Sequence, residues 1–170
     1  MRLIRWTKRG NIEPDYSAAV IEKFLIGFDK NDYDYISIYL SEEFKDIVKN
    51  FKVPGTTDKT YPTASQAFSA MTAIMDLNKN IIKDSDGKPL HMQDKIGQYR
   101  AGSLKFIRYF AMKSYSSILF YKAKYLNEPN GYVRIHIDFK NENGKMLISG
   151  FGFISKTLLK CIRNKKLGVG

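Results

Sequence analysis

The chain has 170 residues, of which 44% are hydrophobic and 26% are charged, and this balance is typical of one folded domain and excludes a disordered chain. No run approaches the roughly 18 consecutive apolar residues that a membrane-spanning helix needs. A single cysteine, Cys161, excludes an internal disulfide, and two histidines with one cysteine exclude the usual zinc sites.

The net charge of +11 is distributed unevenly along the chain. Residues 1–10 hold four basic and no acidic side chains, and residues 155–170 hold five basic and no acidic ones. Residues 11–60, in contrast, hold ten acidic and six basic side chains. A polarised basic surface favours anionic partners, namely nucleic acid, acidic lipid or an acidic protein face. The alternative is that both ends are merely solvated tails. The residues that we predict to form an anionic-partner patch are Arg2, Arg5, Lys8, Arg9, Lys160, Arg163, Lys165 and Lys166.

Helices are predicted in the first half of the chain. A stripe of apolar residues at helical spacing predicts a first helix over 16–30. Two shorter helices should follow, the second of them capped by Ser41. Thr63 and Gln66 match a capping box, which predicts a fourth helix over 63–78.

The second half is predicted to form a sheet. A turn at 84–87 separates two short apolar pieces and predicts a small hairpin. Beyond it, alternating or apolar runs predict four strands, at 103–113, 117–126, 132–140 and 146–154. Because short turns join the last three, they should pair as an antiparallel meander. After them, the sequence predicts either a short amphipathic helix or a frayed end.

The predicted fold class is therefore α+β, with N-terminal helices packed on a curved antiparallel β-sheet formed by the C-terminal half. We expect a single domain over 1–170. It would consist of a basic N-terminal arm (1–14), a globular core (15–154) and a basic C-terminal tail (155–170).

Three residues of the third strand, Arg134, His136 and Asp138, should project from one face. One interpretation makes His136 a base that Asp138 orients. The alternative is a solvated or dimer-facing sheet surface with compensating charges. A nearby alternation of Phe120, Lys122 and Lys124 is the pattern of a single-strand nucleic-acid platform.

Tyrosines are dense around the predicted sheet. They suggest a small-molecule pocket lined by Tyr109, Tyr121, Tyr125 and His136. The alternative is ordinary packing of aromatic residues in the core of a sheet. We expect no catalytic set, no metal ligands and no cofactor, because none of the usual motifs is present in the sequence.

Three stretches carry a resemblance to a known family. Residues 19–44 resemble the opening helices of one superfamily, residues 120–125 and 131–139 resemble its central sheet, and residues 143–151 resemble its last hairpin. This is the nuclear transport factor two-like superfamily. The resemblance implies a cone-shaped α+β fold. Members include isomerases, dehydratases, secretion-system assembly domains and mitochondrial anchoring domains, so the fold alone does not imply an activity. One departure is Met146, which stands where members usually carry a tryptophan.

These observations lead to one main hypothesis and two alternatives. The main one is a non-catalytic binding or assembly module that holds a protein partner or forms a homodimer through its sheet, and approaches anionic surfaces (lipid or nucleic acid) through its basic ends. The first alternative is a small-molecule isomerase or dehydratase with a pocket inside the cone. The second is a nucleic-acid- or membrane-associated accessory or matrix-type protein. We favour a cytoplasmic or membrane-peripheral location over an exported mature form.

Overall fold

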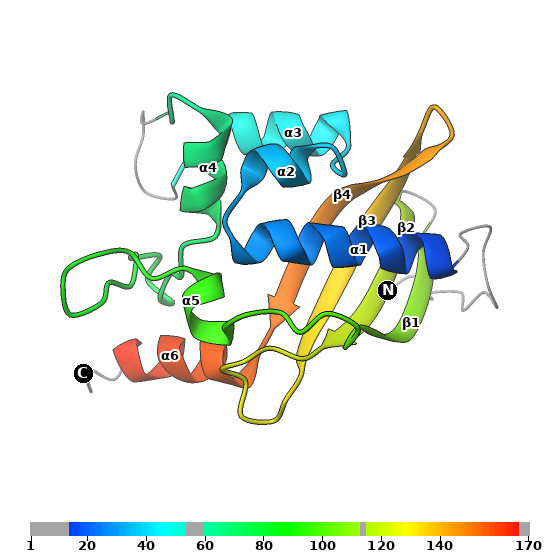
Figure 1. Cartoon of the computed structure of the whole chain (residues 1–170). Coiled ribbons are helices and arrows are strands. Elements are labelled where there is room, and N and C mark those ends of the chain that lie inside the picture. The colour runs from blue at the N-terminus through cyan, green and yellow to red at the C-terminus, as the bar shows by residue number, and fades with distance from the viewer. Residues whose placement is uncertain (1–13, 54–59, 113–114, 167–170) are drawn as a thin grey trace.

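The computed structural model describes residues 14–53, 60–112 and 115–166. In this part of the chain, five helices precede a four-stranded sheet and a sixth helix follows it (Figure 1). The elements are α1 (Pro14–Asp29), α2 (Tyr33–Ser37), α3 (Glu42–Lys49), α4 (Ala64–Met71), α5 (Met92–Ile96), β1 (Lys105–Met112), β2 (Tyr115–Ala123), β3 (Val133–Glu142), β4 (Lys145–Ile154) and α6 (Lys156–Lys166). This order confirms the predicted α+β class, and the sheet is not closed into a barrel.

Helix α1 is held on the sheet by one apolar side. Ile21, Phe24, Leu25 and Phe28 recur at intervals of three and four residues and are fully buried. Figure 1 shows α1 crossing one face of the sheet. The ring of Phe28 stacks on that of Phe153 in β4, with 4.6 Å between the ring centroids. Aromatic packing therefore fills the space between α1 and β4.

Two predicted caps are present where α3 and α4 begin. The hydroxyl of Ser41 accepts a hydrogen bond from the backbone N–H of Phe44 at 3.2 Å. The hydroxyl of Thr63 accepts one from the backbone N–H of Gln66, also at 3.2 Å. Each cap satisfies a donor that the first turn of a helix leaves without a partner.

The prediction that α4 continues to residue 78 was wrong, because the helix ends at Met71. Beyond it the chain is extended, and the backbone N–H of Ile74 donates to the carbonyl of Leu90 at 2.8 Å. The backbone N–H groups of Ile82 and Leu90 donate to the carbonyls of Ile74 and Ile82, each at 2.9 Å. Backbone pairing with the predicted hairpin thus replaces the last helical turns. The short helix α5, which follows the hairpin, was not predicted.

The strands pair in the order β1-β2-β3-β4, each antiparallel to the next. Alternation divides their side chains between two faces, apart from irregularities in the pairing of β1 with β2 and of β3 with β4. The inner face, which α1 covers, is built of buried residues: Leu119, Tyr121 and Ala123 on β2, Ile135, Ile137 and Phe139 on β3, and Ile148 on β4. The outer face carries the residues between them. An extra residue, Ser149, interrupts the pairing of β4 with β3 beside Gly150 and forms a β-bulge.

Of the two alternatives for the C-terminal tail, the amphipathic helix is confirmed, as α6. Leu158 is buried against the rest of the structure, and α6 lies beyond the end of β4 next to α5 (Figure 1). In the described part of the chain, no helix has both the length and the apolar character needed to cross a membrane. The arm residues Arg2, Arg5, Lys8 and Arg9 lie outside the described residues.

Candidate functional site

The start of α6 is fixed by a buried polar contact. The hydroxyl of Ser155 donates a hydrogen bond to the Oε2 atom of Glu128 at 2.5 Å and accepts one from the backbone N–H of Leu158 at 3.3 Å. Ser155 and Glu128 are 2% and 5% exposed. A carboxylate at this end of a helix also suits the positive end of the helix dipole. The loop between β2 and β3, which carries Glu128, therefore sets the position of α6.

On one side of α6 lies a groove of about 600 Å3 that is lined by five lysines and no carboxylate. We call it the lysine groove. Its lysines come from three parts of the chain, namely the hairpin, α5 and α6: Lys83, Lys95, Lys156, Lys160 and Lys165. Side-chain amides and a hydroxyl also line it, from Asn127, Asn130, Asn164 and Thr157. These groups can donate hydrogen bonds to the oxygens of an anion.

The lysine groove has little charge compensation: Asp76, whose pKa is lowered mainly by the backbone N–H of Asn80 and to a smaller extent by the charge of Lys165, does not line it. Ion pairs among the described residues involve Lys45 and Lys140, so none of the five lysines has a carboxylate partner there. The acidic neighbours in sequence, Asp84 and Asp94, instead accept backbone N–H groups at 2.8–2.9 Å. Like charges held around one groove repel one another until an anion binds.

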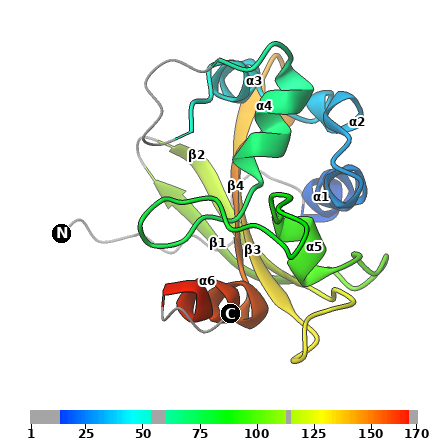
Figure 2. The same ribbon diagram turned by 90° about the vertical axis from the view of Figure 1, so that its left-hand side faces the viewer.

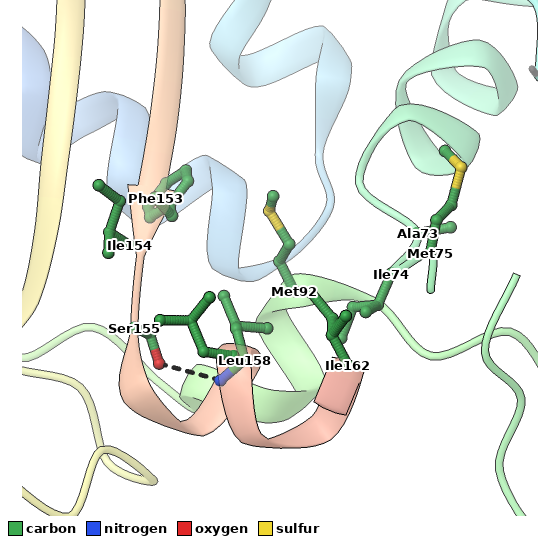
Figure 3. Close-up of a pocket in the computed structure, with 10 residues that line it drawn as sticks. Ala73, Ile74, Met75, Met92, Phe153, Ile154, Ser155, Leu158 and Ile162 are labelled. Carbon is green, nitrogen blue, oxygen red and sulfur yellow. Dashed lines mark hydrogen bonds between the residues drawn. The ribbon is translucent and has the colours of Figure 1, made fainter. Parts of the chain in front are cut away.

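A second groove, of about 200 Å3, lies on another side of α6 and is apolar (Figure 3). It lies between α6, the end of β4 and the extended segment after α4, and its lining includes Ile74, Met75, Met92, Ile154, Leu158, Leu159 and Ile162. Ile154 and Leu159 remain 55% and 45% exposed. Helix α6 thus separates a cationic groove from an apolar one.

The predicted anionic-partner patch is only partly brought together by these features. Lys160 and Lys165 line the lysine groove, whereas Arg163 is exposed elsewhere on α6. Lys166 is the last residue of α6, and its side chain lies outside the described part of the structure. Sequence reasoning missed Lys83 and Lys95, because they lie far from α6 along the chain and no sequence pattern joins them to it.

The predicted tyrosine pocket is not formed by the residues proposed for it. Tyr109, Tyr121 and Tyr125 point inward, and the Tyr121 hydroxyl contacts the Ser17 hydroxyl at 3.0 Å. His136 pairs across strands with Phe120 and lies on the outer face. His136 does not join the tyrosines because side chains alternate along β3, and the even-numbered residues of this strand face away from them. For these tyrosines, the alternative of core packing describes the structure better.

A polar cluster does lie near Tyr125, along the C-terminal half of α1. The backbone N–H of Tyr99 donates to Asp29 Oδ2 at 2.7 Å, and the Tyr99 hydroxyl donates to Glu22 Oε1 at 2.8 Å. Burial raises the pKa of Asp29 to about 6, although the hydrogen bond from Tyr99 lowers it in part. Burial also raises the pKa of Tyr125 well above its ordinary value. Neither groove beside α6 includes these residues.

Within the described residues, no three His, Cys, Asp or Glu side chains gather closely enough to hold a metal ion. Neither protein-family models nor the sequences of curated proteins match this chain. The grooves beside α6 are therefore interpreted from their own chemistry.

Proposed function

We propose that this protein is a non-catalytic binding module that docks an acidic, amphipathic segment of a partner protein along α6. The observation that carries the proposal is the lysine groove, in which five lysines converge without a carboxylate among the lining residues. Glutamate or aspartate side chains of the partner would supply the missing counter-charge. Such complementarity speeds association and sets the orientation of the partner.

The apolar groove supports a protein segment as the partner. Exposed apolar residues such as Leu159 and Ile154 bind apolar side chains, which a purely anionic ligand lacks. An amphipathic helix with one acidic and one apolar side presents both kinds of group at once. We also propose that the chain is a divergent member of the nuclear transport factor two-like superfamily, and the order of helices before an antiparallel meander supports this.

The proposal can be tested with a fluorescently labelled acidic amphipathic peptide, titrated with the full chain at several salt concentrations. Replacing one lysine from each contributing segment, in the variant K83Q/K95Q/K160Q, should weaken binding about tenfold at low salt and less at high salt. The matched control K30Q/K49Q/K52Q removes three exposed lysines elsewhere and should bind as the wild type does.

The variant L159Q separates a protein partner from a simple polyanion. It leaves the net charge unchanged, so weaker peptide binding would show that the apolar groove takes part. If K83Q/K95Q/K160Q and its control lose affinity equally, the attraction comes from total charge and the proposed site fails. Stronger binding to phosphatidylserine vesicles than to the peptide would replace the protein partner with a membrane.

A further inference from the structure

The outer face of the sheet carries a second cationic surface, separate from α6. Cross-strand pairing places Lys105 of β1 opposite Lys122 of β2, and Lys122 opposite Arg134 of β3. Like charges directly opposite each other destabilise a sheet by repulsion. No carboxylate among the described residues forms an ion pair with any of the three. Lys124 follows β2, two residues after Lys122, and its ammonium lies 5.5 Å from the centre of the Tyr132 ring.

An aromatic row lies next to these cations. Phe120 pairs across strands with Arg108 on one side and with His136 on the other. The rings of Phe120 and His136 are 6.0 Å apart at an angle of 40°. A groove of about 190 Å3, lined by Ile107, Arg108, Phe120 and Arg134, opens at this place. An aromatic ring therefore lies between two arginines.

The two glycines of β4 explain how the outer face is divided. A Cβ atom at Gly152 would collide with the ring of His136, and one at Gly150 would lie 2.8 Å from Asp138 Oδ2. His136 and Asp138 thus lean over the glycines of β4, so the Asp138 carboxylate extends away from β1 and β2. The cations and the Phe120 ring are left together on the other three strands.

No described helix covers this part of the outer face. In Figure 2, α1, α2 and α5 lie on the inner side of the sheet, and Figure 1 shows α6 beyond the end of β4, away from β1. Arg134 and Lys105 are exposed accordingly. The surface is accessible to a ligand at these two positions.

We propose that the outer face of β1, β2 and β3 binds single-stranded nucleic acid. Lysines and arginines on one face would contact successive phosphates, and an unpaired base would stack on Phe120 in the groove between Arg108 and Arg134. A protein partner fits this surface less well, because protein interfaces are depleted of lysine whereas nucleic-acid interfaces are rich in positive charge. A duplex fits less well too, because its paired bases are not available for stacking on a sheet.

The test is fluorescence anisotropy of a labelled single strand of about 12 nucleotides, a length in the range that one such surface contacts. The variant K122Q/R134Q should weaken binding, and the slope of log K against log salt should fall by about 1.4, since each single-strand phosphate contact contributes about 0.7. The control K49Q/K52Q on and next to α3 has the same charge change and should keep the wild-type slope.

Phe120 provides a test of stacking that leaves charge unchanged. F120L should lose about tenfold in affinity for the single strand, and F120W should restore it, because tryptophan also stacks on bases. Since F120L could also disturb folding, its thermal unfolding is measured in parallel, and K122Q/R134Q gives an independent answer.

Three results would overturn the proposal. They are no binding at low salt, equal affinity for a duplex of the same length, and an equal loss in the K49Q/K52Q control. A loss of strand binding in K83Q/K95Q/K160Q but not in K122Q/R134Q would place the nucleic acid along α6 instead. Because the two sites use different residues, either proposal can fail while the other stands.

Discussion

The hydroxyl of Ser155 donates a 2.5 Å hydrogen bond to the buried carboxylate of Glu128, at the point where β4 ends and α6 begins. The same hydroxyl caps α6 by accepting the backbone N–H of Leu158. One side chain therefore joins the β2–β3 loop to the helix that separates the two grooves.

Removing this hydroxyl should loosen α6. We expect S155A to lower the free energy of unfolding by about 1–3 kcal/mol, because it removes a helix cap and leaves a buried carboxylate without its donor. Urea denaturation followed by circular dichroism measures the change. S65A, on the exposed side of α4, should change stability by less than about 0.5 kcal/mol. Equal effects of the two substitutions would contradict the role given to Ser155.

The raised pKa of Asp29 predicts a pH dependence of stability. Its folded-state pKa of about 6 exceeds the ordinary value of 3.8, so the folded state holds the proton more tightly than the unfolded state. The resulting stabilisation is complete below pH 3.8 and is lost as the pH rises through about 6.

The variant D29N isolates this contribution, because an amide of the same shape does not titrate. Between pH 4 and pH 7, the stability of D29N relative to the wild type should rise by about 1 kcal/mol, a figure reduced for the partial exposure of Asp29. Urea denaturation at several pH values provides the measurement. A constant difference between the two proteins would show that Asp29 does not titrate in this range.

Repulsion within the lysine groove predicts that a compact polyanion stabilises the fold. Inorganic tripolyphosphate should raise the melting temperature of the wild type by a few degrees, since a ligand that binds only the folded state stabilises it. The increase should be smaller in K83Q/K95Q/K160Q. In the control K30Q/K49Q/K52Q it should match the wild type, and differential scanning fluorimetry can compare all three. The same increase in every protein would indicate diffuse attraction only.

Close contact between His136 and Gly152 predicts a strong steric coupling. G152A should lower stability by about 1–3 kcal/mol, because the new methyl group would collide with the imidazole ring. In the double variant H136A/G152A the ring is absent and most of the loss should disappear. A double-mutant cycle from chemical denaturation measures the coupling energy. Additive effects would mean that the ring moves aside freely.

Local patterns predicted most of the secondary structure. Alternation identified β3 and its neighbours, and the caps at Ser41 and Thr63 marked where helices begin. The prediction of a helix beyond Met71 was wrong, because Ile74 and Met75 fit an apolar helical stripe as well as they fit an extended segment. Backbone hydrogen bonds to Ile82 and Leu90, made across a turn, decided between the two.

The order of helices before an antiparallel sheet, the basic character of the tail and the division of β3 into two faces follow from the sequence, because each depends on near neighbours in the chain. Only the tertiary structure decided which charges meet. Lys83 and Lys95 join α6 in one groove, and Lys105, Lys122 and Arg134 form one row, through contacts between segments far apart in sequence. Coulomb repulsion and ligand binding depend on distance in space. No sequence pattern links side chains that are brought together only by folding.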